Sequence, residues 1–270
     1  MLKLMSDRIK NIFKNKSKKL VTFVTGGDPD YESSMNIIKK ISENGADIIE
    51  IGMPFSDPMA DGPIIQLSSL RAIKQEINLN KIFLMCKEFR KFNNNIPIIL
   101  MGYYNPILHY GNENFISKCS ESGVDGLIIV DLQPENDNEL LSLAKKNNIE
   151  FIRLITPTTD ESRLNIILSN ASGFIYYVSV TGITGQKSAD LTLLKKSIMK
   201  IKEKSKLPVL VGFGIKSPEQ AKDIVKFADG VIVGSSIVKI IQSHIVDKVS
   251  INNATEKIIK FVKLLKEAII

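Results

Sequence analysis

A single carboxylate interrupts an apolar segment that we expect to form a buried strand. Glu50 lies in ADIIEIG, residues 46–52, where a parallel strand covered on both faces ordinarily has Val or Ile. Burial disfavours the charged form of a carboxyl group and raises its pKa toward the range used in general acid and base catalysis. A structural ion pair inside the fold, for instance with Arg153, is the alternative. The strand-interior position of Glu50 favours a catalytic role over that ion pair.

The segment that follows this strand is rich in residues that restrict the backbone. Residues 52–63, GMPFSDPMADGP, contain three prolines, two glycines and two aspartates. Each proline fixes φ and lacks an N–H donor, so we expect a stiff loop. Asp57 and Asp61 are compatible with ordinary turns, where Asp commonly precedes Pro or Gly. A second carboxylate close to Glu50 would instead let one group transfer protons while the other stays ionised.

Two segments in the last third of the chain have the features of an anion site. In 208–221, PVLVGFGIKSPEQA, glycines and then a helix start follow an apolar run, and 231–238, VIVGSSIV, repeats this arrangement with serines. Backbone N–H groups at glycine turns and helix N-termini bind phosphate. Either segment alone is compatible with an ordinary tight turn, but together they predict a phosphorylated substrate. The residues concerned are Gly212, Gly214, Ser217, Pro218, Gln220, Gly234, Ser235 and Ser236.

A glycine-containing polar segment, residues 179–190, follows the sixth apolar run. Its sequence, SVTGITGQKSAD, places Gly182 and Gly185 among hydroxyl-bearing residues with little apolar anchoring. This composition favours a mobile lid, and an ordinary polar loop is the alternative.

Eight short apolar runs, rich in β-branched residues, are separated by longer segments of helical period. This alternation is typical of βα units around a parallel sheet, and eight units favour a closed barrel over an open sheet. In such a barrel the active site lies at the C-terminal ends of the strands, where the loops described above begin. The runs are residues 20–26, 47–52, 97–103, 126–132, 150–156, 174–180, 208–214 and 230–236.

We therefore predict an α/β fold, a (βα)8 TIM barrel that forms a single domain over residues 1–270. Residues 5–16 predict an extra N-terminal helix able to close the bottom of the barrel, and helical segments near 64–75 and 79–92 predict an extra helix after strand two. In residues 257–270, one apolar stripe lies opposite lysines, which favours a helix packed on the barrel wall over a membrane-surface helix. That stripe contains Ile258, Phe261, Val262 and Leu265.

The sequence lacks the residues that several kinds of catalysis require. His109 and His244 are the only histidines, which disfavours a metal site built on imidazole. No apolar run ends in an inward-facing lysine for a Schiff base, and no GxSxG motif marks a hydrolase nucleophile. Cys86 and Cys119 are isolated, so we expect buried free thiols. The electron sink of a carbon–carbon cleavage would then belong to the substrate.

The composition indicates a folded protein with a basic surface. Hydrophobic residues make up 44% of the chain and the formal net charge is +7. Five of the 36 basic residues are arginines, so 31 are scattered lysines, which favours solvated helix faces and attraction of small anions over nucleic-acid binding. Neither a membrane span nor a secretory signal is indicated, so we expect a cytoplasmic protein.

Several motifs together closely resemble those of the tryptophan synthase alpha chain family, in order and over almost the whole chain. The resemblance implies cleavage of indole-3-glycerol phosphate to indole and glyceraldehyde 3-phosphate. It also implies no cofactor in this chain and a partner beta chain that holds pyridoxal phosphate, within an alpha2-beta2 complex. The loop 53–63 and Asn105-Pro106 would face that partner. The motifs are IEIGMPFSDPMADGPIIQ, GYYNPI, GVDGLIIVDL, YYVSVTGITG and VGFGIKSPEQ.

The resemblance also assigns roles to individual residues. Glu50 would be the acid and base that protonates indole C3 and takes the proton of the glycerol hydroxyl, and Asp61 would accept the indole N–H. Asp131 would support the lid threonine, Thr184. The residues implied in substrate binding are Phe23 and Tyr176 for the indole, Gly185, Gly214, Gly234 and Ser235 for the phosphate, and in addition Thr184 and Phe213.

One departure from the family pattern and two other functions remain open. Gln133 and Asn136 lie in a rim loop where the family pattern is richer in proline and acidic residues, so lid closure and partner communication could differ. Another phosphosugar isomerase or aldolase of the same fold would not need Glu50 and Asp61 at this spacing. A subunit that only activates its partner is disfavoured, because both carboxylates and both phosphate segments are present.

Overall fold

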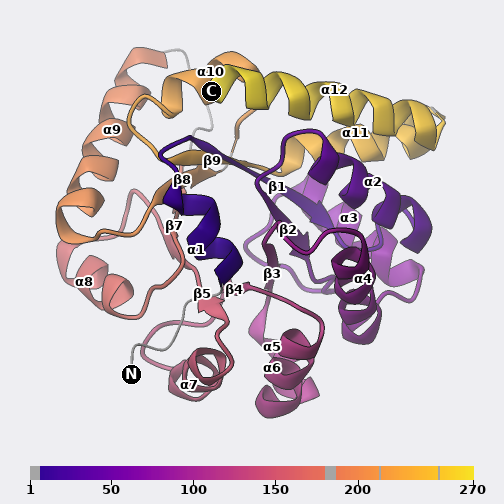
Figure 1. The fold of residues 1–270 in the computed structure, drawn as a ribbon, viewed down its shortest axis with the longest axis horizontal. Helices are drawn as coiled ribbons and strands as arrows, with labels where there is room; N and C mark the ends of the chain where they lie inside the picture. The colour runs from indigo at the N-terminus through magenta and orange to yellow at the C-terminus, as the bar shows by residue number, and fades with distance from the viewer. Residues whose placement is uncertain (1–6, 180–186, 213, 249) are drawn as a thin grey trace.

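The strands of this computed structural model, which describes residues 7–179, 187–212, 214–248 and 250–270, are all parallel and form one barrel (Figure 1). Their order is β5-β4-β3-β2-β1-β9-β8-β7-β6, and β5 and β6 are consecutive along the chain with only Ile152 between them. The two ends of the sheet therefore meet in one continuous segment, and the barrel closes. The strands are β1 Lys19–Thr25, β2 Ile48–Gly52, β3 Ile98–Gly102, β4 Gly126–Ile129, β5 Glu150–Phe151, β6 Arg153–Ile155, β7 Ile175–Val178, β8 Val209–Gly212 and β9 Gly230–Val233.

The predicted barrel is confirmed, with one local difference in the fifth predicted strand. That strand is divided at Ile152 because β5 pairs with β4 whereas β6 pairs with β7. The N–H of Ile152 still donates to the carbonyl of Leu127 at 2.9 Å, so the division does not open the barrel.

Helices surround the barrel and follow the strands in alternation. Two helices, α3 and α4, follow β2 as predicted. The segment after β3 also contains two helices, α5 and α6, which the sequence analysis did not separate because only Gly111 lies between them. Its φ of +87° favours glycine and lets the chain turn between α5 and α6. The helices are α1 Asp7–Lys14, α2 Tyr31–Glu43, α3 Pro63–Lys74, α4 Leu79–Phe92, α5 Tyr104–Tyr110, α6 Asn112–Glu121, α7 Asn138–Lys146, α8 Glu161–Ser169, α9 Lys187–Lys204, α10 Pro218–Ile224, α11 Ser235–Val246 and α12 Ile251–Ile269.

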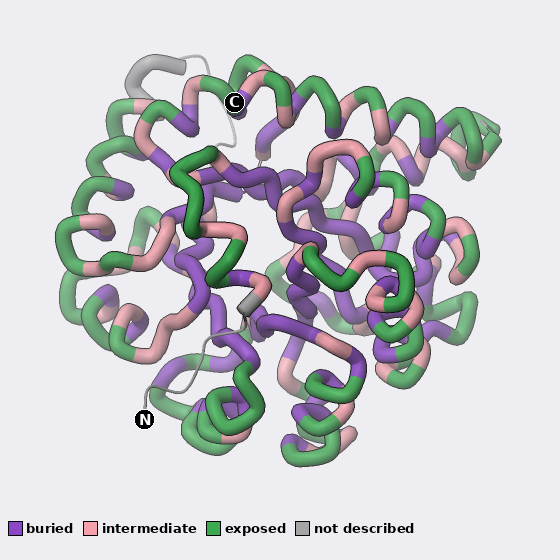
Figure 2. Tube along the Cα trace, viewed as in Figure 1, coloured by how far each residue is buried: buried purple, intermediate pink, exposed green. Residues whose placement is uncertain are grey.

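The apolar core has two layers, one inside the barrel and one between the barrel and its helices. Figure 2 shows buried residues along the strands of the barrel and on the sides of the helices that face it. The inner layer includes Ile9 of α1, which is fully buried, with Ile12 and Phe13 packed beside it. In Figure 1, α1 lies across the centre of the barrel, so the predicted closure of the barrel bottom by the N-terminal helix is confirmed.

The C-terminal helix α12 packs against the outer layer. Ile258, Val262 and Leu265 are fully buried, and the helix contacts α2, α10 and α11, as expected for a helix on the barrel wall. Phe261 lies at the edge of the same stripe and is half-buried. In the part of the chain that the structure describes, no helix is both long and apolar enough to cross a membrane.

A repeated hydrogen bond stabilises the N-terminal end of the barrel. Before β2, β4, β7 and β9, a side-chain oxygen accepts a backbone N–H near the start of β1, β3, β5 and β8, respectively, at 2.7–2.8 Å. These N–H groups lie at the starts of the strands. The side-chain oxygens supply the hydrogen-bond acceptors that such buried backbone donors need. The four pairs are Asp47 with Leu20, Asp125 with Ile98, Ser172 with Phe151, and Asp229 with Val209.

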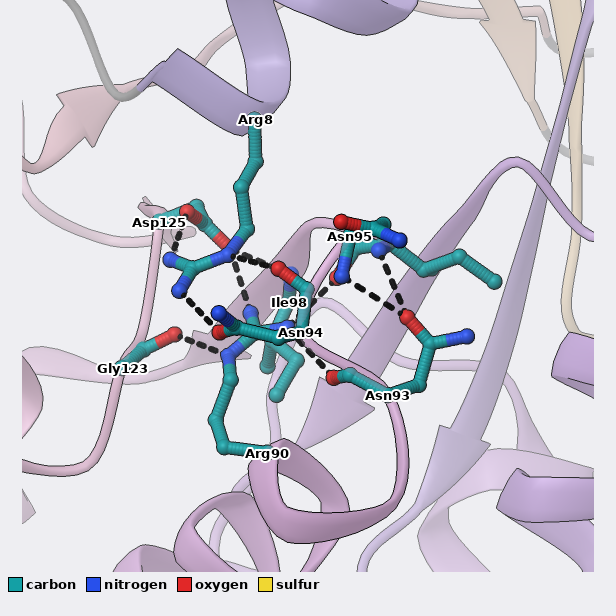
Figure 3. Close-up of polar contacts among 9 residues, drawn as sticks. Arg8, Arg90, Asn93, Asn94, Asn95, Ile98, Gly123 and Asp125 are labelled. Atoms are coloured by element: carbon teal, nitrogen blue, oxygen red, sulfur yellow. Dashed lines mark hydrogen bonds and ion pairs between the residues drawn. The ribbon is translucent and has the colours of Figure 1, made fainter.

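Asp125 also joins α1 to α4 through two arginines (Figure 3). Its carboxylate contacts Arg8 at 3.0 Å and Arg90 at 2.5 Å. Arg8 donates in addition to both oxygens of Asn94, and Arg90 donates to the carbonyl of Gly123 at 2.8 Å. This cluster fastens the N-terminal helix across the end of the barrel that lies away from the predicted active site.

Candidate active site

Glu50 of β2 is enclosed by the barrel, as its place in the sequence predicted. It lies in register with Phe23 of β1 and Ile99 of β3, and only 1% of it is exposed. Among the described residues, neither carboxylate oxygen has a hydrogen-bond partner. Burial, with a smaller contribution from the nearby Asp61, raises the pKa of Glu50 to about 8. The carboxyl group is therefore largely protonated at neutral pH.

The alternative ion pair between Glu50 and Arg153 is wrong. Arg153 pairs with the buried carboxylate of Asp137, and its guanidinium lies 4.2 Å from the centre of the Phe151 ring. These contacts direct the arginine side chain to other partners, so Glu50 has no structural counter-charge from strand five.

Asp61 ends the loop after β2 and is held by a tyrosine that the sequence analysis did not single out. The hydroxyl of Tyr103 donates to Asp61 Oδ2 at 3.1 Å and accepts from the N–H of Ala60 at 3.0 Å. Burial raises the pKa of Asp61, while the hydrogen bond from Tyr103 acts in the opposite direction. Tyr103 lies in the GYYNPI motif, which is the signal that could have pointed to it.

Side-chain contacts fix the loop that carries Asp61. Ser69 Oγ accepts the N–H of Phe55 at 2.8 Å and donates to its carbonyl at 2.9 Å, and the rings of Phe55 and Tyr103 lie 5.5 Å apart. Asp57 is exposed in a tight turn, where its carbonyl accepts the N–H of Met59 at 2.9 Å. The turn-forming interpretation thus applies to Asp57, whereas Asp61 points toward the site.

Two strand-end glycines make room for the aromatic side chains of the site. A Cβ added to Gly52 would come within 2.6 Å of the Phe23 ring, and one added to Gly212 would come within 2.4 Å of the Tyr176 hydroxyl. No side chain fits at either position without displacing the aromatic ring. The sequence analysis assigned Gly212 to an anion site and did not consider Gly52, because the contacts that each glycine permits come from other strands.

One cavity brings most of the predicted site residues together. Its volume is about 330 Å³, within the range of small-molecule sites. Glu50 and Asp61 line it with an apolar wall that includes Phe23, Tyr176 and Met101. Burial is the main cause that raises the pKa of Tyr176, and the nearby Glu50 and Asp61 raise it further. The predicted residues among its lining are Phe23, Glu50, Asp61, Tyr176, Gly214, Gly234 and Ser235.

Another part of the cavity lining has the features expected for a phosphate site. Gly234 is the N-cap of α11, whose first turn presents backbone N–H groups that the helix does not use itself. Gly214, with a φ of +82°, belongs to the neighbouring loop, and Ser236 Oγ joins the two loops by donating to Ile215 O at 2.8 Å. Lys216 also lines the cavity, and the sequence analysis did not single it out.

The helix start predicted after β8 is confirmed, although it lies beside the cavity and not in its wall. Ser217 is the N-cap of α10 and accepts the N–H of Gln220, and Pro218 begins the helix. The side chain of Gln220 accepts the N–H of Lys216 at 2.7 Å, which fixes the loop that lines the cavity.

The remaining predicted site residues lie elsewhere or outside the described residues. Asp131 is exposed, does not line the cavity, and accepts the N–H of Tyr104 at 2.8 Å. Thr184, Gly185 and Phe213, and most of the predicted lid, fall outside the described residues. Gln133 and Asn136 are exposed in a turn where the N–H of Asn136 donates to the carbonyl of Gln133 at 3.0 Å.

The geometry supports proton transfer next to an anchored anion. Glu50 is buried and its two carboxyl oxygens have no hydrogen-bond partner among the described residues. The partly buried Asp61 accepts a hydrogen bond from Tyr103, and a helix N-terminus lines the same cavity. Within the described ranges, no group of three His, Cys, Asp or Glu residues is arranged to hold a metal ion. Cys86 and Cys119 are buried and free, as predicted.

Comparison with known proteins identifies the family. The family model described as tryptophan synthase alpha chain matches residues 9–269. The chain belongs to the tryptophan synthase alpha chain family. It is accordingly a lyase of tryptophan biosynthesis, and the resemblance seen in its motifs is confirmed.

Solved structures agree with this family and with the fold. Tryptophan synthase subunit alpha from Legionella pneumophila str. Paris is 37% identical, with 97% of each chain covered and a TM-score of 0.88. A structure from Aquifex aeolicus VF5 is 38% identical over 98% of each chain, with a TM-score of 0.86. Tryptophan synthase from M. tuberculosis in an aminoacrylate-bound form is 26% identical over 97% of this chain and 99% of that one, with a TM-score of 0.84.

Proposed function

We propose that this lyase cleaves indole-3-glycerol phosphate to indole and glyceraldehyde 3-phosphate. The observation that carries the proposal is the shared cavity, in which a buried, unpaired Glu50 lies with Asp61 near a helix N-terminus suited to phosphate. The electron sink is the indole ring itself, because protonation at C3 converts it into a cation that accepts the electrons of the broken bond.

Glu50 both donates and accepts a proton in this reaction. With a pKa of about 8 it begins protonated and gives its proton to indole C3. The resulting carboxylate then takes the proton of the glycerol hydroxyl as the carbon–carbon bond breaks and the aldehyde forms. The side chain ends in its starting protonation state, so one buried carboxyl group completes the proton balance without a second base.

Asp61 stabilises the charge that develops on the indole ring. Its carboxylate accepts the ring N–H and opposes the positive charge that C3 protonation creates. The hydroxyl of Tyr103 holds this carboxylate at 3.1 Å and so orients it before the substrate binds. Tyr103 is thus a positioning residue for Asp61.

The indole and the phosphate occupy different parts of the cavity. Phe23 and Tyr176 enclose the ring, and Gly214, Gly234 and Ser235 surround the phosphate together with the first turn of α11. The charge of Lys216 favours the same anion. Thr184, Gly185 and Phe213 complete the substrate site and Asp131 supports the lid, as the family resemblance implies.

A beta chain that carries pyridoxal phosphate consumes the indole in an alpha2-beta2 complex in the cytoplasm. Two exposed apolar side chains near the active-site loops support a partner surface, because Met59 is 84% exposed and Leu108 is 59% exposed. Met59 belongs to the loop after β2, and Leu108 lies two residues after Pro106 in α5. The single domain of residues 1–270 presents this surface as one unit.

The decisive experiment measures indole release from indole-3-glycerol phosphate by the purified chain, alone and with a beta chain from the same source. We expect slow release alone and a strong increase on mixing. Absence of release under both conditions would contradict the proposal and favour another phosphorylated substrate or a non-catalytic subunit.

Glu50→Gln should reduce indole release at least about 100-fold, because the amide keeps the shape but cannot transfer the proton. Circular dichroism and binding to the beta chain should remain as in the wild type. Turnover at the wild-type rate in this variant would show that Glu50 is not the acid.

A further inference from the structure

A groove of about 710 Å³ opens at the N-terminal end of the barrel, away from the candidate active site. Its walls come from the segment between α1 and β1 and from the segment between α9 and β8. Because β8, β9 and β1 are adjacent, the groove spans the starts of three neighbouring strands. We name it the lysine groove after four of its lining residues, Lys16, Lys18, Lys202 and Lys206.

The positive charge of the lysine groove is only partly compensated. Asp229 is its one lining carboxylate, and it already contacts Lys202 at 2.8 Å and accepts the N–H of Val209. Lys18 donates to a backbone carbonyl, that of Ala228, at 2.7 Å. Within the described chain, neither Lys16 nor Lys206 has a carboxylate within 4 Å. Convergence of like charges in a concave surface attracts anions.

A fifth lysine lies behind the groove wall. Lys19 is 2% exposed, and its ammonium group donates to Asn15 Oδ1 and to Ser17 Oγ, both of which line the groove. Burial lowers its pKa, and the more distant Asp47 only partly opposes this effect. A buried ammonium without a close carboxylate is costly, so an anion in the groove would stabilise it.

Beside the lysines, the groove has an apolar side. Phe13 is half-buried with its ring 6.1 Å from that of Phe174, and Leu207 and Pro208 extend the same surface. The volume lies within the range of sites for small organic molecules, and apolar and aromatic surface favours a flat ring. Inorganic phosphate would use only the cationic side.

We propose that the lysine groove is a second anion site that binds a nucleotide-sized polyphosphate. The phosphates lie between Lys16, Lys18 and Lys206, and the ring of the ligand packs on Phe13 and Leu207. This site does not depend on the reaction proposed above, because it lies at the other end of the barrel and shares no residue with the active-site cavity.

The test uses isothermal titration calorimetry of the full chain with ATP as the probe and tripolyphosphate as the probe without a ring. We expect one saturable ATP site in the wild type, weakened at least about tenfold in the double variant Lys16→Ala/Lys206→Ala. Tripolyphosphate should bind more weakly than ATP, and both affinities should fall as salt rises.

A matched control removes the same amount of charge elsewhere. Lys257 and Lys260 are exposed on α12, so Lys257→Ala/Lys260→Ala should bind ATP like the wild type. Both double variants should keep wild-type circular dichroism and indole release. The proposal is overturned by three results: no saturable ATP binding at millimolar concentration, equal weakening in both double variants, or unchanged binding in the groove variant. Tripolyphosphate binding as tight as ATP would overturn the role of Phe13 and Leu207.

Discussion

At the scale of single residues, Glu50 combines catalytic value with a cost in stability. Its folded-state pKa of about 8 lies above the unfolded value of 4.5, so the folded state keeps a proton that the unfolded state releases between these pH values. The free energy of unfolding therefore falls as pH rises through that window. We expect Glu50→Gln to stabilise the fold by about 2–4 kcal/mol at pH 8 and to have little effect near pH 4, measured by urea unfolding at both pH values. An equal effect at both would argue against a protonated, buried Glu50.

At the scale of elements, the repeated aspartates at the strand starts determine how helices attach to the barrel. Asp125 binds Ile98 of β3, Arg8 of α1 and Arg90 of α4, and burial lowers the pKa of Arg90 to about 10. Asp125→Asn removes the charge that both arginines face and should cost about 3 kcal/mol of unfolding free energy, measured in urea. The control is Glu121→Gln, which breaks an exposed pair with Lys118 and should cost less than about 1 kcal/mol. Equal losses would show that the Asp125 cluster is not a main attachment.

At the scale of the whole molecule, the two ends of the barrel have separate tasks. The active-site cavity lies at the C-terminal ends of the strands, whereas α1 closes the N-terminal end through the fully buried Ile9. Ile9→Ala should lower the unfolding free energy by about 2–4 kcal/mol and leave the rate of indole release by the folded protein unchanged. Ile12→Ala, at a partly buried position of the same helix, should cost less. A large loss of indole release in Ile9→Ala under conditions where it is fully folded would show that the two ends are coupled.

Features that depend on neighbours along the chain were determined by the sequence alone. The β-branched runs predicted the barrel strands, and the Ser217-Pro218 start of α10 followed from local capping. The burial of Glu50 was predictable because both faces of a parallel barrel strand are covered, so every side chain on the strand is buried. The family followed from motifs, each of which is contiguous in the sequence.

Features that join distant segments were decided only by the tertiary structure. Tyr103 meets Asp61 across 42 residues, and Gly52 and Gly212 admit rings from neighbouring strands. The lysine groove likewise combines segments almost 190 residues apart. Composition and periodicity describe each segment by itself, whereas these contacts arise when strand pairing within the barrel places segments that are far apart in the sequence side by side.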